Sequence, residues 1–104
     1  MELQATQSRF AVEAAKLILV AQSMGFEVTL GDAYRDERCD YGSPTSKHRK
    51  RLAIDLNLFR DGIWLTETSQ HEPLGLYWQS IGGIWGGNFS DPDGNHYEWP
   101  EGEN

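Results

Sequence analysis

Residues 52–59, with the sequence LAIDLNLF, constrain the fold more than any other part of the chain. Large aliphatic side chains alternate there with smaller or polar ones, which is the period of a β-strand with one buried face. The pair Asp61 and Gly62 follows and favours a two-residue hairpin turn, from which residues 63–65 return as a partner strand. The sequence therefore predicts an antiparallel sheet built around residues 52–59.

Two helices and two more strands are predicted on either side of this hairpin. Apolar residues recur at steps of three and four from about residue 6 to residue 24, which indicates a long amphipathic helix. A shorter helix is expected from residue 72 to about residue 81, and alternation at 26–30 and 96–99 predicts strands. The expected fold class is α+β: a small single domain with a mostly antiparallel sheet, a long N-terminal helix and a short second helix.

Length and charge restrict the function classes. A chain of 104 residues suits one domain, which we expect to occupy 1–104. The net charge is −7, and residues 61–104 contain no Lys or Arg. Such a chain is a poor nucleic-acid binder, because phosphate backbones are held by basic side chains. The one basic cluster, at 47–51, is either a solvated patch or an attractor of substrate carboxylates.

Cysteine content and hydropathy bear on the compartment and on metal chemistry. The N-terminus lacks the basic region of a signal peptide, and the longest apolar stretch is too short to cross a bilayer. We therefore expect synthesis in the cytoplasm without a signal peptide, and no membrane insertion. Cys39 is the only cysteine, which excludes an internal disulfide and a thiolate cluster. Any metal site must use histidine and carboxylate ligands.

Asp55 is the residue of the central strand that most needs an explanation, since an unpaired carboxylate is costly to bury. An ion pair with an arginine or a solvent-facing side of the sheet would explain it. A second explanation is a metal, because His48 lies seven residues earlier and His96 lies in the last strand, with Glu98 on the same strand face. Two histidines and one aspartate leave a fourth position open for water, as in catalytic zinc sites.

Three ordered segments resemble one known family. Residues 46–56, SKHRKRLAIDL, resemble the S-x-H-x-x-G-x-A-x-D signature of the bacterial and phage zinc peptidases that cut peptidoglycan stem peptides. This is the D-alanyl-D-alanine peptidase and L-alanyl-D-glutamate endopeptidase family. Residues 85–98 resemble its second element, W-G-G-[D/N]-[F/W] followed by D-x-x-H-[F/Y]-E, and Tyr34 and Arg35 its upstream Y-R element. Arg51 departs from the signature, which has Gly there.

The resemblance implies a ligand set and a general base. His48, Asp55 and His96 would bind Zn²⁺, and Asp93 would be the base that takes a proton from water and delivers it to the leaving amine. Asp91 and Glu98 are rivals for the base. Asp91 better suits the Asp-Pro-Asp-Gly turn, and Glu98 is better placed to orient a ligand or to bind substrate.

Other residues keep two interpretations. Arg35 resembles the family arginine that supports the negative charge on the carbonyl oxygen or holds a substrate carboxylate, and it is otherwise an exposed arginine at a strand end. Ser46 either contacts substrate or caps the loop that carries His48. His71 matches no element of the family, and we expect it to be exposed to solvent. The four tryptophans are expected in the core or in groove walls.

The combined prediction is a zinc metallopeptidase that hydrolyses an amide bond of peptidoglycan stem peptides. The compact form resembles phage endolysins, which favours an L-alanyl-D-glutamate endopeptidase that acts as a monomer, without a cell-wall-binding domain, after holin-assisted release to the cell wall. A D-alanyl-D-alanine carboxypeptidase or dipeptidase is the second hypothesis. A non-catalytic peptidoglycan- or protein-binding module on the same fold is the third.

Overall fold

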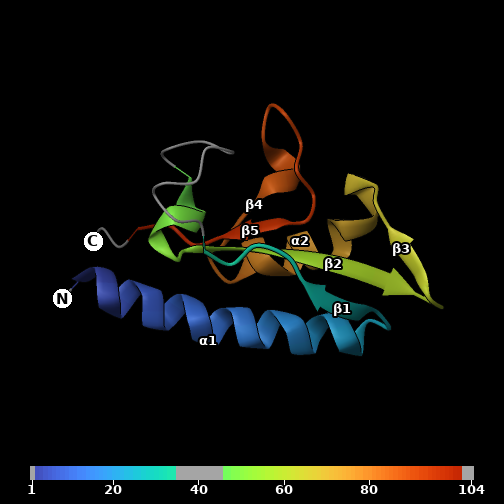
Figure 1. Cartoon of the computed structure of the whole chain (residues 1–104), viewed down its shortest axis with the longest axis horizontal. Helices are drawn as coiled ribbons and strands as arrows, with labels where there is room; N and C mark the ends of the chain where they lie inside the picture. Colours follow the sequence, from blue (N-terminus) through green and yellow to red (C-terminus); the bar gives the residue numbers. More distant parts are fainter. Residues whose placement is uncertain (1, 35–45, 102–104) are drawn as a thin grey trace.

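The computed structural model describes residues 2–34 and 46–101. It has a long helix and a short helix with a small sheet, in the predicted α+β class (Figure 1). The helices are α1 (Glu2–Ser23) and α2 (Glu72–Ser80). The strands are β1 (Glu27–Leu30), β2 (Ala53–Arg60), β3 (Ile63–Leu65), β4 (Ile84–Trp85) and β5 (His96–Glu98).

The sheet is arranged around β2, and its paired strands are antiparallel. The order is β1-β2-β5-β4, with β3 also paired to β2. Because β2 is eight residues long, one of its edges holds both β5, at residues 53–55, and β3, at residues 58–60. A gap between β3 and β5 is thereby left along this edge.

The predicted hairpin is confirmed. Asp61 and Gly62 both have positive φ, 53° and 78°, as the expected turn requires. The two-residue strand β4 was not predicted, nor were the short 3₁₀ helices at 47–50, 68–71 and 86–88. These segments are too short to show a period, and their contacts with the rest of the fold determine them.

Both helices pack against one face of the sheet. Figure 1 shows α1 running alongside it, and α2 contributes Trp78, whose ring meets Tyr97 of β5 edge to face at 6.3 Å. The core is made of the apolar faces of α1, α2 and β2, with Phe26, Trp85, Tyr97 and Trp99. Trp64 on β3 is the exception among the tryptophans, with 58% of its surface exposed. No helix in the described part of the chain is long and apolar enough to cross a membrane.

The prediction that His71 is exposed is wrong. Only 3% of its surface is accessible, and its Nδ1 lies 2.8 Å from the hydroxyl oxygen of Tyr97. The turn at 68–71, closed by a capping box between Glu67 and Gln70, places the imidazole against the Tyr97 hydroxyl. Burial lowers the pKa of His71 to about 4, because the charged ring would lose its hydration there.

Candidate metal centre

The register between β2 and β5 places Asp55 directly opposite His96. The backbone N–H and C=O of Asp55 bond instead to Asp32 and Gly31, on the β1 side. Asp55 and His96 are therefore a non-hydrogen-bonded pair of the antiparallel ladder, the kind in which facing side chains come closest. The Oδ1 of Asp55 lies 3.4 Å from the Nδ1 of His96.

His48 reaches the same carboxylate from the 3₁₀ helix at 47–50. The Ser46 hydroxyl accepts a hydrogen bond of 3.1 Å from the His48 backbone N–H, and so caps this helix, as one of its two interpretations predicted. His48 is 2% exposed, and its Nε2 lies 3.1 Å from the Oδ1 of Asp55. The cap therefore fixes the loop that presents His48 to β2.

Arg51 stands where the family signature has Gly, and its backbone conformation shows why the loop tolerates this difference. Its φ is 58°, the left-handed region that Gly enters without strain and that costs other residues about 1–2 kcal/mol. Its guanidinium lies 4.1 Å from the ring centre of Tyr34, which is 44% exposed. The backbone therefore keeps the shape that the signature glycine favours, and the arginine side chain joins Tyr34 to the loop.

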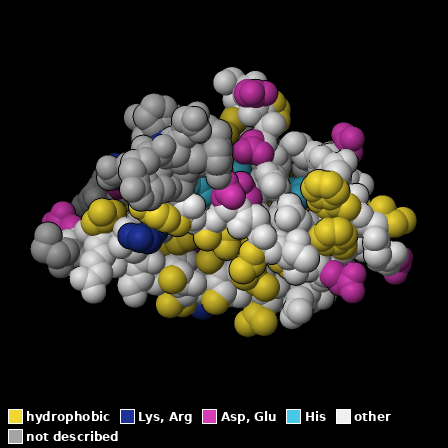
Figure 2. All heavy atoms as spheres, in the orientation of Figure 1, with side chains coloured by type: hydrophobic (Ala, Val, Ile, Leu, Met, Phe, Trp, Pro, Cys, Tyr) yellow, Lys and Arg dark blue, Asp and Glu magenta, His cyan; other side chains and the backbone are white. Residues whose placement is uncertain are grey.

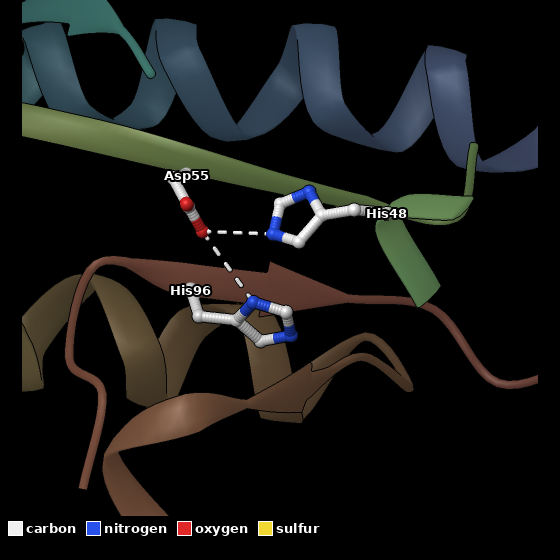
Figure 3. A group of neighbouring side chains, drawn as sticks. All are labelled: His48, Asp55 and His96. Atoms are coloured by element: carbon white, nitrogen blue, oxygen red, sulfur yellow. Dashed lines mark hydrogen bonds and ion pairs between the residues drawn. The ribbon is translucent and has the colours of Figure 1, made fainter. Parts of the chain in front are cut away.

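The three predicted ligands meet at one point (Figure 3). His48 and His96 project toward Asp55, and one donor atom from each residue lies within 4.8 Å of the others. The two rings meet edge to face, with centres 5.0 Å apart. Two imidazole nitrogens and a carboxylate oxygen are donors that zinc accepts, and three protein ligands are the number found in catalytic zinc sites.

Glu98 determines how His96 can act. Its Oε1 lies 2.8 Å from the Nε2 of His96, and its Oε2 lies 3.4 Å from Lys47 Nζ. A histidine that donates its Nε2 proton to a carboxylate directs the lone pair of Nδ1 the other way, here toward Asp55. Two electron-rich atoms then face each other, an arrangement stabilised by a proton or a metal cation between them. The site therefore fits a metal, and Glu98 is in the position of a ligand-orienting carboxylate.

The electrostatics reflect this clustering. Burial opposes the charge on both Asp55 and His96, but their mutual hydrogen bond and those to His48 and Glu98 outweigh it. The pKa of Asp55 falls to about 2 and that of His96 rises to about 9. For Glu98, burial acts to raise the pKa, but the bonds from His96 and Lys47 lower it on balance.

Asp93 lies on the turn that leads into β5, within the segment between β4 and β5 that rises above the sheet in Figure 1. Its carbonyl accepts from the His96 N–H at 3.1 Å, and its own N–H donates to Gly86 at 2.9 Å. A side chain at Gly86 would place its Cβ 2.3 Å from the Asp93 carbonyl oxygen, so this turn requires glycine there. Partial desolvation, followed by the charge of Asp55, raises the pKa of Asp93, as suits a general base.

The basic cluster at 47–51 has acidic partners. Lys47 pairs with Glu98, and Lys50 lies 2.5 Å from Glu101. Sequence reasoning missed both pairs, since they join residues 51 positions apart. Arg35, the predicted anion-binding residue, lies outside the described residues.

Comparison with known proteins identifies a peptidase family whose matched region contains these site residues. A family model described as D-alanyl-D-alanine carboxypeptidase matches residues 40–99, more than half of the chain. The chain belongs to this family of peptidases. Membership of this family indicates that the chain is a peptidase that acts on peptidoglycan. Peptidases of this family typically depend on zinc. The match includes His48, Asp55, Asp93 and His96.

A solved structure shares the fold. The L-Ala D-Glu endopeptidase ChiX of Serratia marcescens superposes with a TM-score of 0.66 and 14% sequence identity. The similarity covers 96% of this chain and 87% of that chain, so the two proteins have one architecture over nearly their whole lengths. No curated protein sequence matches the chain.

Proposed function

We propose that the chain is a zinc metallopeptidase that hydrolyses the L-alanyl-D-glutamate bond of peptidoglycan stem peptides, with residues 1–104 as one catalytic domain. The observation that carries the proposal is the convergence of His48 Nε2, Asp55 Oδ1 and His96 Nδ1 on the open face of the sheet. Asp93 stands three residues before His96, close enough for the Asp55 charge to act on its pKa.

His48, Asp55 and His96 would hold the metal, and Glu98 would keep His96 in the required tautomer. When bound, Zn²⁺ supplies Lewis-acid polarisation of the scissile carbonyl and acidifies the attacking water. The carboxylate of Asp93 would take the proton from that water and pass it to the nitrogen of the leaving amine. Arg35 would support the negative charge on the carbonyl oxygen or hold a carboxylate of the substrate.

The choice of bond rests on the fold neighbour, which is an L-Ala D-Glu endopeptidase. The family description favours the second candidate, a D-alanyl-D-alanine carboxypeptidase or dipeptidase. For the L-alanyl-D-glutamate endopeptidase we propose a monomeric enzyme of endolysin type, which reaches the cell wall with the help of a holin. A peptidoglycan- or protein-binding module without catalysis is the third candidate.

The deciding experiment is digestion of purified murein by the zinc-loaded chain, with Asp93→Asn and Asp91→Asn as a matched pair from the same turn. We expect Asp93→Asn to retain one bound zinc and to lose about 10²–10⁴-fold in rate, the usual contribution of a general base. Asp91 is exposed, and Asp91→Asn should cleave like the wild type. Equal rates for wild type and Asp93→Asn would overturn the assignment of the base.

The products identify the bond. Cleavage at L-alanyl-D-glutamate exposes a new amino group on glutamate, whereas the carboxypeptidase releases free D-alanine. Chelated wild-type protein should be inactive and should recover with added zinc. Binding to murein without any new amino group would favour the binding module.

A further inference from the structure

A cavity of about 300 Å³ lies beside the metal centre, in the gap between β3 and the turn that precedes β5. Asn57 of β2 lines it, two residues after Asp55 on the same strand face, so the cavity and the ligands share the open side of the sheet. Its walls come from β3, the 3₁₀ helix at 68–71 and the turn at 92–95. None of these residues is among the three predicted metal ligands.

The position of the cavity relative to the metal centre follows from strand geometry. Alternate residues of a strand are about 7 Å apart, which separates Asp55 from Asn57, and Phe59 lies another such step along. The open face of β2 thus has three successive positions: a metal ligand, a residue of the cavity and an aromatic ring. A substrate held at Asp55 and extended along this strand would place a group two residue lengths away in the cavity.

The lining of the cavity is mostly neutral and rich in hydrogen-bonding groups. Asn57, Thr66, Thr68, His71 and Asn95 contribute amide, hydroxyl and imidazole groups, and Asp93 is the one charged residue of the lining. His71 is neutral near pH 7, because burial lowers its pKa to about 4. Figure 2 shows histidine side chains (cyan) at separate places, one of them beside hydrophobic side chains toward the β3 end, with Asp or Glu side chains (magenta) and no Lys or Arg in view between them.

Trp64 adds a large apolar surface to this polar lining. It is 58% exposed, and its ring stacks on that of Phe59 with centres 6.4 Å apart and planes inclined by 22°. The stacking holds the indole in place at the cavity without burying it. A fixed aromatic face beside neutral amides and hydroxyls suits a pyranose ring, which has an apolar face of C–H groups and a polar rim.

We propose that this cavity, with Trp64, binds the amino sugar to which the stem peptide is attached. The proposal deepens the proposed function and rests on it. In peptidoglycan the scissile carbonyl belongs to an L-alanine, and a lactyl group joins the nitrogen of that alanine to the sugar ring. Together the alanine and the lactyl group span about two residue lengths, roughly 7 Å, which equals the step from Asp55 to Asn57.

The test compares two substrates with the same scissile bond: N-acetylmuramyl-L-Ala-D-Glu, and N-acetyl-L-Ala-D-Glu, which lacks the sugar. The measured quantity is the ratio of their kcat/KM values. In Trp64→Ala this ratio should fall about tenfold, as expected when one aromatic contact is lost. It should stay at the wild-type value in Ile63→Ala, which removes a neighbouring side chain that is 65% exposed and does not line the cavity. Trp64→Tyr, which restores a ring, should recover most of the ratio.

A binding titration separates this proposal from the proposed function. N-acetylmuramic acid is added to the chelated protein, and the indole N–H resonance of Trp64 is followed by NMR. A saturable shift in wild type and Ile63→Ala supports the sugar subsite even if neither substrate is cleaved, in which case the proposed function alone fails. Cleavage of both substrates with an unchanged ratio in Trp64→Ala overturns the subsite and leaves the proposed function standing. Absence of a shift at high sugar concentration also overturns the subsite.

Discussion

The two faces of β5 hold buried histidines in opposite electrostatic settings. His96 on the open face is 6% exposed, and His71, which contacts Tyr97 on the core face, is 3% exposed. Burial disfavours the charge on both rings. On the open face, the hydrogen bonds to Asp55 and Glu98 outweigh burial and raise the pKa of His96 to about 9. On the core face His71 pairs with the phenol hydroxyl of Tyr97, and burial lowers its pKa to about 4.

The difference shows that burial alone does not identify a functional histidine. What distinguishes His96 is that both of its ring nitrogens face carboxylates, one from its own strand and one from the neighbouring strand. The neutral ring of His71 instead pairs with the Tyr97 hydroxyl and has no carboxylate partner among the described residues. Changes to the ligands and carboxylates around His96 should therefore alter metal binding, and changes around His71 should alter stability.

The largest effect is expected from removal of the central ligand. Asp55→Ala should weaken zinc binding by more than about a hundredfold, because loss of a partner outside the ligand set alone typically costs 10–100-fold. A competition titration against a chromophoric chelator measures the affinity. Asn57→Ala, two positions along the same strand face, is the matched control and should bind zinc like the wild type. An affinity for Asp55→Ala within fivefold of the wild type would disprove the ligand assignment.

The orienting carboxylate should come next. Glu98→Ala should reduce zinc affinity about 10–100-fold, because His96 then loses the acceptor that fixes its tautomer. Glu101→Ala removes another carboxylate that pairs with a lysine, but at an exposed site away from His96. The two variants are compared in the same chelator titration. Equal affinities would show that Glu98 acts only through its ion pair with Lys47.

These residues also show what a sequence can predict. The period of residues 52–59 and the pair Asp61 and Gly62 are local properties, so they predict β2, its buried face and the hairpin turn. The two-step spacing of His96 and Glu98 likewise placed both on one strand face. The 3.4 Å approach of His96 to Asp55, however, depends on a register between strands far apart in sequence. The residue types suggested a shared metal site for these two residues, and the family resemblance, not periodicity, assigned them as ligands.

His71 illustrates the opposite case. Its burial depends on the turn at 68–71 and on the hydroxyl of Tyr97, 26 residues later, and no period in residues 66–72 indicates a buried position. The capping-box pair Glu67 and Gln70 was the available signal, since it marks an ordered turn in place of a loose loop. Similarly, β4 has only two residues, and its pairing with β5 defines it.

The core-face histidine should make stability depend on pH. Between about pH 4 and pH 6.5 the unfolded chain binds a proton at His71 that the folded chain does not, so the free energy of unfolding decreases as the pH falls through this range. The loss attributable to this residue is about 3 kcal/mol. His71→Gln can accept a hydrogen bond from Tyr97 but does not titrate. Urea unfolding of both chelated proteins at pH 7 and pH 4 should show the wild type losing about 3 kcal/mol more than the variant. Parallel losses would show that His71 is protonated in the folded state.

The smallest effect is expected from the hydroxyl of Tyr97. Tyr97→Phe removes the hydrogen bond to His71 but keeps the ring that packs on Trp78, so unfolding at pH 7 should become easier by about 1 kcal/mol. Zinc affinity should stay within twofold of the wild type, since the side chains of residues 97 and 96 project to opposite faces of β5. The contrast with Glu98→Ala, one residue further on, makes this the most selective test of the two-face comparison. A zinc affinity lowered as far in Tyr97→Phe as in Glu98→Ala would mean that the core face positions His96 as well. The orienting role would then belong to the whole strand, and not to the Glu98 carboxylate.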